Sequence, residues 1–480
     1  MKMTADLEQK GSLAVTTAAK RYHFIGAGGI GMSGLAKIML KKEAAVTGSD
    51  QTQSPVTDKL NQTGAVISIG HNCSNLPEGV ETVVISAAIK EDNPELQLAK
   101  ARGCKIYKYA QMLGLLMDSF DGVAIAGTHG KSTTGGWLAY TLKRAGIDVN
   151  FVIGADVSQL GTNSGNGDSR LFIAEACEYD RSFWNLKPKV AVILNVEPDH
   201  LDIYQTEENV VDAFEHFAMG TKDGGVLITN GMDKNVQKIV ENLRRQKKQI
   251  DIELFGMDNS FDYYPENIES NDGLYSFDVC CRGEKLGRAN LSVPGKHNIL
   301  NALAVVATAV KCGADGKNIV ELLSLFTGMD RRLMDRGTFG GIKVIDDYAH
   351  HPTEIRASLS AIRDRYKCKR LWCVYQPHQY SRTKFLLDDF AKSFNLADIT
   401  IVPDIYFVRD VQATRKVVNA QILVERIRRN GAAALFIDGF EKTLDYLKEN
   451  VRSGDLVVIM GAGDIWKVAD EYIQWLGKDS

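Results

Sequence analysis

The sequence predicts an α/β protein of three domains. Strand-like apolar runs alternate with helical stretches over the whole chain, which is typical of parallel sheets. Its 480 residues suffice for about three domains at roughly 100–200 residues each. Three segments each open with a strand that runs into a glycine-rich or acidic turn. We therefore expect domains over residues 1–118, 119–330 and 331–480.

Composition and charge exclude several classes of protein. Apolar residues make up 44% of the chain, which is ordinary for a globular protein. The 57 Lys and Arg against 60 Asp and Glu give a net charge of −3. This near balance does not favour a nucleic acid or an anionic membrane as partner. The N-terminus lacks a signal peptide's apolar stretch, and no uncharged run is long enough to span a bilayer. The eight cysteines lack metal-binding spacing. We expect a cytoplasmic protein with reduced thiols and no membrane insertion, as a monomer or a weak homodimer.

The first segment carries a glycine fingerprint between a strand, residues 22–25, and a helical stretch, residues 32–40. Residues 26–31 read GAGGIG. Glycines let the backbone turn tightly and approach a pyrophosphate at the helix N-terminus. Asp50 follows the next strand, where a ribose hydroxyl would bind. The pattern predicts a Rossmann-like domain, and on these residues alone a nicotinamide dinucleotide, a UDP-sugar and an empty turn all remain open.

The second segment carries a phosphate-binding loop after the strand at residues 123–126. Residues 127–133 read GTHGKST and precede a helix to about Arg144, which Gly146 would cap. Backbone amides would cradle phosphates, Lys131 would neutralise the transferring group and the Ser132 hydroxyl would hold Mg²⁺. The pattern predicts a P-loop ATPase-like domain that binds ATP. Short alternating runs near its end predict additional antiparallel strands.

Further polar residues of this segment follow strand ends, where ligands collect in α/β sheets. Glu175 lies in EACEYD and His200 in NVEPDHLD, and both are candidate metal ligands. A lone histidine is more often structural, but the phosphate loop favours the metal role here. In GKHNILNA, Asn298 either caps a helix or meets an adenine edge, and His297 would reach the phosphates.

The third segment places polar clusters after three apolar strands. DDYAHHP follows residues 342–345, QPHQYSRT follows residues 371–375, and GAGDI follows residues 456–460. Because three strand ends of one sheet each carry polar or glycine residues, we expect them to form a single crevice. The pair Arg331-Arg332, just before this segment, would supply positive charge to a phosphoryl group in transfer.

Together these motifs resemble the Mur ligase family. The order GAGGIGMSG, GTHGKST, EACEYD, NVEPDHLD, GKHNILNA, RR, DDYAHHPTE, QPHQYSRT and GAGDI extends over residues 21–470. The resemblance implies a first domain that binds UDP, a central ATP-binding domain and a Rossmann-like C-terminal domain that binds the amino acid. The intact first fingerprint and DDYAHHPTE further imply ligation of L-alanine to the lactyl carboxylate of UDP-N-acetylmuramate through an acyl phosphate, in peptidoglycan precursor synthesis.

The resemblance also implies roles for individual residues. Those along the UDP-sugar would be Gly26, Gly28, Gly29, Gly31, Asp50, His71 and Ser86. Those around ATP would be Gly127, Thr128, His129, Gly130, Lys131, Ser132, Thr133, Asn298, Asn301, Arg332 and Asp347, with Ser132, Glu175 and His200 holding Mg²⁺. Those near the amino acid would be Tyr348, His350, His351, His378 and Arg382, and we add His297 as a substrate contact. We expect catalysis to depend on Lys131, Glu175, His200, His350, His351 and Arg382.

Some positions depart from the family pattern. Ser132 stands where threonine is common, EACEYD replaces EADESD, the neighbours of Arg331-Arg332 differ, and Gln379 replaces an arginine. Gln379 removes one positive charge near the amino-acid site, so the pattern does not fix the preferred amino acid. Three other functions remain open: a ligase for a whole peptide, a dehydrogenase and an inactive nucleotide-binding regulator. The dehydrogenase would leave GTHGKST unexplained, and the regulator would require a broken metal site.

Overall fold

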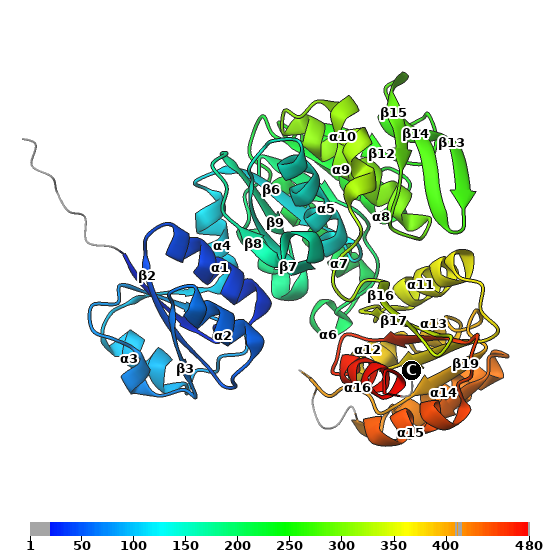
Figure 1. The fold of residues 1–480 in the computed structure, drawn as a ribbon. Coiled ribbons are helices and arrows are strands. Elements are labelled where there is room, and N and C mark those ends of the chain that lie inside the picture. The colour runs from blue at the N-terminus through cyan, green and yellow to red at the C-terminus, as the bar shows by residue number, and fades with distance from the viewer. Residues whose placement is uncertain (1–19, 409, 411–414, 479–480) are drawn as a thin grey trace, which may run out of the picture. The chain divides into compact units, whose positions relative to one another are not determined.

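The computed structural model describes residues 20–408, 410 and 415–478, and it confirms the α/β fold (Figure 1). The chain divides into two compact units, one up to Tyr109 and one from Ala110. The expected domain boundaries at residues 118 and 331 stay predictions, and the outermost residues, 1–19 and 479–480, lie outside the described part. Within that part, no helix has the length and apolar character that a membrane span requires.

The first unit is built on a parallel sheet in the order β3-β2-β1-β4-β5. Its strands are β1 (Arg21–Ile25), β2 (Ala45–Asp50), β3 (Val66–Ile69), β4 (Thr82–Ile85) and β5 (Lys105–Lys108), and its helices are α1 (Ile30–Lys41), α2 (Pro55–Gln62) and α3 (Pro94–Ala101). The strand order reverses at β1, which places the glycine turn at the point where such sheets form a ligand crevice. This confirms the Rossmann-like prediction.

The central sheet of the second unit has the order β15-β14-β13-β12-β11-β10-β6-β9-β7-β8. Its strands are β6 (Asp121–Ala126), β7 (Asn150–Val157), β8 (Thr162–Gly165), β9 (Leu171–Glu175), β10 (Val190–Ile193), β11 (Val226–Asn230), β12 (Asp251–Phe255), β13 (Tyr263–Asn271), β14 (Leu274–Cys281) and β15 (Glu284–Asn290). The pairs β13-β14 and β14-β15 are antiparallel, as predicted. Because β6 runs parallel to both β9 and β10, the carboxyl ends of these three strands lie side by side.

Helices α4 (Tyr109–Met117), α5 (Lys131–Arg144), α6 (Leu201–Tyr204), α7 (Glu207–Met219), α8 (Lys234–Arg245), α9 (His297–Lys311) and α10 (Gly316–Leu322) accompany these strands. Two glycines let α5 approach its neighbours closely: a Cβ on Gly135 would lie 2.8 Å from a carbon of Ile153, and one on Gly136 would lie 2.4 Å from the sulfur of Met329. Trp137 follows them, fully buried against Phe326. This packing fixes the helix whose N-terminus bears the phosphate loop.

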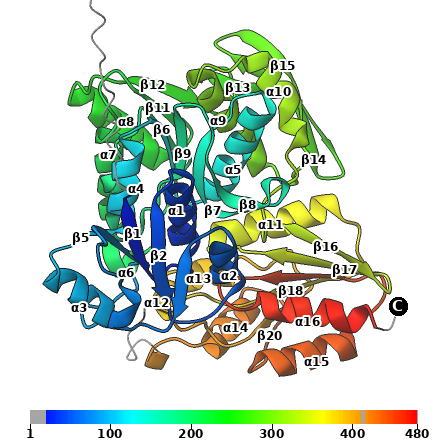
Figure 2. The same cartoon turned by 60° about the vertical axis from the view of Figure 1, so that its left-hand side comes forward.

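The third sheet has the order β16-β17-β21-β18-β19-β20. Its strands are β16 (Met334–Phe339), β17 (Ile342–Asp347), β18 (Leu371–Tyr375), β19 (Ile399–Val402), β20 (Ala434–Phe436) and β21 (Leu456–Met460). Its helices are α11 (Pro352–Arg365), α12 (Tyr380–Phe385), α13 (Leu387–Ala391), α14 (Ala420–Arg429), α15 (Phe440–Asn450) and α16 (Trp466–Leu476). Separate buried clusters lie on its two faces, one with α11 and α14 and one with α15 and α16. Helices α15 and α16 lie side by side (Figure 2).

The three polar clusters of the last segment follow adjacent strands. Asp347 of β17 and Tyr375 of β18 both pair with Met460 of β21, so the three carboxyl ends are level. The single crevice predicted for them is consistent with this register. One detail differs from expectation: Asp346 and Asp347 end β17 instead of following it, because the strand pairing with β21 continues through both residues.

Candidate active site

The phosphate loop joins β6 to α5 with two glycines in conformations that other residues rarely adopt. Gly127 has φ +148° and Gly130, the N-cap of α5, has φ +81°. A Cβ on Gly127 would lie 3.0 Å from that of Leu194, so the loop also needs glycine for space. No described side chain caps α5, so its first amides are left for an anion.

Lys131 is held across this loop by an acidic partner. Its Nζ donates to the Thr128 carbonyl at 3.1 Å and lies 2.8 Å from a carboxylate oxygen of Glu178, which is almost fully buried. Burial alone would lower the pKa of Lys131, but Glu178 and the neighbouring Glu175 act together with Cys177 to raise that pKa. The ammonium is therefore charged and lies at the mouth of the loop, where a phosphate would meet it.

The predicted metal ligands gather beside Lys131. The Ser132 hydroxyl donates to the Glu175 carboxylate at 2.7 Å. Nε2 of His200 lies 3.8 Å from the Glu178 carboxylate, and its Nδ1 is buried without a hydrogen-bond partner among the described residues. A hydroxyl and carboxylates are the oxygen ligands that Mg²⁺ prefers, so Ser132 and Glu175 fit this ion.

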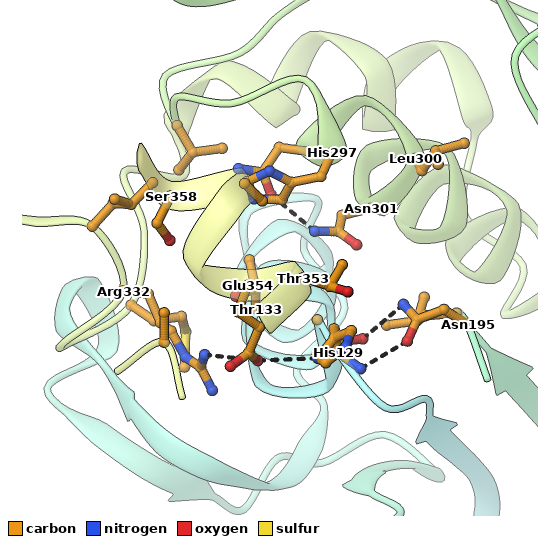
Figure 3. A pocket seen from close by; sticks show the side chains of 18 of the residues that line it. His129, Thr133, Asn195, His297, Leu300, Asn301, Arg332, Thr353, Glu354 and Ser358 are labelled. Atoms are coloured by element: carbon orange, nitrogen blue, oxygen red, sulfur yellow. Dashed lines mark hydrogen bonds and ion pairs between the residues drawn. The ribbon is translucent and has the colours of Figure 1, made fainter. Parts of the chain in front are cut away.

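A cavity of about 380 Å³ opens beside the phosphate loop, between the central and third sheets (Figure 3). The predicted residues that line it are His129, Gly130, Thr133, His297, Asn298, Asn301, Arg332 and Asp347. Sequence reasoning missed several other lining residues, among them Asn195, Asn230, Met232, Phe255, Leu300 and Ser358. Asn195 and Leu300 had a signal, since they lie in NVEPDHLD and GKHNILNA. The others are unremarkable in sequence and meet only through folding.

Asp347 is the buried carboxylate of this cavity. It is 2% exposed, and its Oδ2 has no hydrogen-bond partner among the described residues. Burial raises the pKa of Asp347 to about 6, against the smaller lowering effect of Ser358 and Arg332. An unpaired buried acceptor is costly, so this oxygen is a candidate acceptor for a ligand hydroxyl.

The two asparagines of GKHNILNA bind each other. Asn301 donates to the side-chain oxygen of Asn298 at 2.9 Å, and Asn298 donates to the Pro294 carbonyl at 2.7 Å. The capping alternative for Asn298 is wrong, because α9 begins at His297 with Lys296 as its N-cap. With the amide of Asn298 already engaged, the side-chain oxygen of Asn301, 3.0 Å from an ideal Cβ on Gly130, faces the phosphate loop.

The arginine pair at the start of the third segment divides between two tasks. Arg332 lines the cavity, and its guanidinium lies 4.8 Å from the Tyr348 ring centre. Arg331 donates to the Gly461 carbonyl at 2.8 Å and lies 3.5 Å from the Asp346 carboxylate. Arg332 therefore faces the cavity beside the phosphate loop, whereas Arg331 connects two strand ends of the third sheet.

Residues predicted around the amino acid form a row at the ends of β17 and β18. The rings of Tyr348 and His350 are 5.4 Å apart, and those of His350 and His378 are 6.1 Å apart. Arg382 donates to the His378 carbonyl at 3.1 Å and makes a bidentate pair with Asp199, at 2.8 and 3.2 Å. The Arg382 guanidinium, which the family resemblance implies would pair with the amino-acid carboxylate, is held by Asp199 in this conformation.

His351 differs from its neighbour in having both ring nitrogens engaged. It is the N-cap of α11, where Nδ1 accepts from the Thr353 amide, and Nε2 lies 3.2 Å from the Pro198 carbonyl. Burial lowers the pKa of His351 to about 4, so its ring is neutral. Gln379, the departure from the family pattern, is buried at φ +74° with its amide 3.4 Å from the Val408 carbonyl.

In the first unit, the predicted residues converge on the carboxyl edge of the sheet. The Gly28 amide donates to the Asp50 carboxylate at 2.7 Å. A Cβ on Gly26 would lie 2.8 Å from that of Ser86, so the fingerprint turn packs directly on the loop after β4. Gly29, the N-cap of α1, has no side-chain cap among the described residues. Gly31 serves packing, since a Cβ there would lie 2.6 Å from the Tyr109 ring.

A buried acid behind this edge escaped sequence reasoning. Glu95 is fully buried, contacts Nε2 of His23 and the Ser49 hydroxyl at 2.7 Å each, and lies 3.4 Å from His71. Burial would raise the pKa of Glu95, but the hydrogen bonds from His23 and Ser49 lower it. The predicted ligand residue His71 is thus held from behind by a carboxylate whose sequence surroundings, on α3, give no functional signal.

Comparison with known families gives three matches in chain order. "Mur ligase family, catalytic domain" matches residues 21–121, "Mur ligase middle domain" matches residues 125–309, and "Mur ligase, glutamate ligase domain" matches residues 331–463.

Curated relatives and solved structures agree with these matches. The UDP-N-acetylmuramate–L-alanine ligase of Caldanaerobacter subterraneus is 41% identical over 95% of this chain and 97% of its own, and that of Clostridium tetani is 40% identical over 95% and 98%. The UDP-N-acetylmuramate–alanine ligase of Thermotoga maritima superposes with a TM-score of 0.79, at 25% identity over 96% of this chain and 100% of its own. A murein peptide ligase of Psychrobacter arcticus gives 0.71 at 26% identity, over 96% and 99%.

Proposed function

The chain belongs to the Mur ligase family, and we propose that it joins L-alanine to the lactyl carboxylate of UDP-N-acetylmuramate at the expense of ATP, in peptidoglycan precursor synthesis. The observation that carries this is the identity of about 40% to L-alanine ligases over nearly the full length of both chains. The phosphate loop, the cavity beside it and the glycine turn of the first unit are the sites such a reaction requires. The expected cytoplasmic location and oligomeric state remain predictions.

ATP would bind in the cavity with its phosphates at the N-terminus of α5. Lys131 would contact the β- and γ-phosphates, and the unpaired Oδ2 of Asp347 would accept from a ribose hydroxyl. Ser132 and Glu175 would hold one Mg²⁺ and His200 a second, and these ions would offset the charge of the phosphates. The UDP-sugar would lie along the glycine turn, Asp50, His71 and Ser86 of the first unit.

The reaction would proceed in two displacements. An oxygen of the lactyl carboxylate attacks the γ-phosphorus and ADP leaves, giving an acyl phosphate. The neutral amine of L-alanine attacks the acyl carbon, phosphate leaves with the electrons of the C–O bond, and the nitrogen loses a proton. Between the two candidate histidines, we propose His350 as the acceptor of that proton, because both ring nitrogens of His351 are already engaged.

The test is phosphate release from ATP and Mg²⁺ with UDP-N-acetylmuramate, with and without L-alanine. We expect release only when both are present, with a product heavier than UDP-N-acetylmuramate by one alanine residue. A peptide ligase is the second candidate, since a murein peptide ligase also superposes on this chain. Release with L-alanyl-γ-D-glutamyl-diaminopimelate but not with L-alanine would overturn the proposed substrate and keep the reaction class.

A further inference from the structure

Glu354 stands at the start of α11, where one of its carboxylate oxygens closes the helix N-terminus. Oε2 accepts from the His350 amide at 2.9 Å and lies 3.3 Å from the His351 amide nitrogen. His351 caps the same helix reciprocally, so the two residues form a capping box. This oxygen fixes the backbone that carries the two candidate histidines of the amino-acid site.

The other oxygen of Glu354 reaches out of the third sheet to the phosphate loop. Oε1 lies 3.2 Å from Nδ1 of His129 and 3.6 Å from Nη1 of Arg332 (Figure 3). The side chain is only 11% exposed. Burial alone would raise the pKa of Glu354, but His350 and His129 hold it well below its usual range. The group is therefore a carboxylate, surrounded by the Arg332 guanidinium and the imidazoles of His129 and His350.

His129 is in turn fixed on its other sides by the central sheet. Asn195 accepts from the His129 amide at 2.7 Å and donates to its carbonyl at 3.1 Å. Nε2 of His129 lies 3.5 Å from the Glu197 carboxylate. His129 therefore links Glu354, through its ring, to the phosphate loop, of which its backbone is part.

We propose that Glu354 is a positioning residue that couples the phosphate loop to the amino-acid site. Through His129 and Arg332 it sets two groups that face the nucleotide, and through the amides of His350 and His351 it sets the face that receives the amine. This role rests on the proposed ligase function and assigns Glu354 no contact with a reacting atom. If Glu354 had only a local structural role, it would cap α11 and its charge would not affect the phosphate loop.

Glu354→Gln separates the two roles. Glutamine closes a capping box as glutamate does, but it carries no charge for His129 or Arg332. We expect kcat to fall about 10- to 100-fold, with a modest loss of stability because the raised pKa of His129 is partly lost. Glu354→Ala, which also loses the cap, should unfold at still lower denaturant. Asp364→Asn is the matched control, since it makes the same carboxylate-to-amide change at an exposed site on the same helix and should match the wild type.

A spectroscopic measurement reports the coupling without any turnover. Histidine resonances of the full chain are titrated by NMR, with His129 assigned from its loss in His129→Gln. The groups that face this imidazole are Glu354, Glu197 and the ring of His351. We expect the pKa of His129, which is about 9 in the wild type, to drop by more than one in Glu354→Gln. In the kinetic assay, we compare Glu354→Gln, His129→Gln and the variant that carries both substitutions. The double variant should be no slower than the slower of the two single variants.

Three results would overturn the proposal: wild-type kcat in Glu354→Gln, an unmoved His129 titration, or multiplicative effects of the two substitutions. Failure of the proposed function itself is distinguishable. In that case the wild type releases no phosphate with L-alanine, while the His129 titration still reports whether Glu354 controls the phosphate loop.

Discussion

The hydroxyl of Ser132 and the carboxylate of Glu175 meet at 2.7 Å where a metal bound to ATP phosphates would lie. Removing the hydroxyl leaves the loop backbone intact but takes away one oxygen ligand. We expect Ser132→Ala to lower kcat about 100-fold and to raise the Mg²⁺ concentration for half-maximal rate, in steady-state assays at varied Mg²⁺. Ser132→Thr keeps the hydroxyl and should stay within a few-fold of the wild type; equal losses in both variants would exclude the metal role.

At Asp347, a proposed ATP contact, burial of the carboxylate lowers stability at neutral pH. Its pKa is about 6 in the folded protein, above its ordinary value, because the carboxylate is buried. The folded state therefore binds the proton more tightly than the unfolded state, and this group makes stability fall as pH rises from about 4 to 6.

We expect Asp347→Asn to raise the free energy of unfolding at pH 7 by about 1–3 kcal/mol while reducing the affinity for ATP. Urea unfolding at pH 4 and pH 7.5, together with ATP titration, measures both effects. The gain in stability should shrink toward pH 4, where the wild-type carboxyl is neutral. A variant that is less stable than the wild type at pH 7.5 would show that the carboxylate is satisfied within the protein.

At the scale of elements, the turn between β1 and α1 combines a backbone and a space requirement. Gly26 and Gly70 share φ +82°, but a Cβ on Gly26 would lie 2.8 Å from that of Ser86, whereas one on Gly70 has nothing within 4 Å. In both alanine variants, the left-handed backbone lowers the free energy of unfolding by about 1–2 kcal/mol. We expect Gly26→Ala to lose at least 1 kcal/mol more and to weaken binding of UDP-N-acetylmuramate.

Thermal unfolding and calorimetric titration with UDP-N-acetylmuramate compare these two variants. Because their φ values match, the difference between them isolates the contact of the turn with the loop after β4. Indistinguishable variants would mean that this loop moves aside freely, and that the close packing of Gly26 has no part in shaping the site.

At the scale of the second unit, a charged cluster joins the central and third sheets. Burial alone would lower the pKa of His129, but its hydrogen bonds with Glu197 and Glu354 raise it to about 9. A raised histidine pKa contributes stability that is complete below its ordinary value of about 6.5 and is lost as pH rises through 9.

We expect the wild-type free energy of unfolding to fall by about 1–2 kcal/mol more than that of His129→Gln between pH 7 and 9.5. Urea unfolding at several pH values measures this difference, with the exposed His216→Gln as control. Parallel pH curves for wild type and His129→Gln would show that the cluster contributes nothing to holding the two sheets together.

Sequence alone determined the α/β class, the glycine turn, the phosphate loop and the metal-ligand candidates, because each depends on residue types at short spacing. The strands Leu371–Tyr375 and Leu456–Met460 and the end of α5 at Arg144 were predicted at their observed bounds for the same reason. Short-range patterns also carried the family resemblance, since its motifs are contiguous segments that stand in a fixed order.

Only the tertiary structure decided which groups meet across long separations. It turned Arg331 away from the cavity and Arg332 into it, engaged both nitrogens of His351, and brought Phe255 and Ser358 into one lining. It also placed Glu354 against His129, 225 residues away in sequence. Such pairings depend on strand order and on how helices pack over the sheets, and residue spacing along the chain does not encode them in a form that can be read directly.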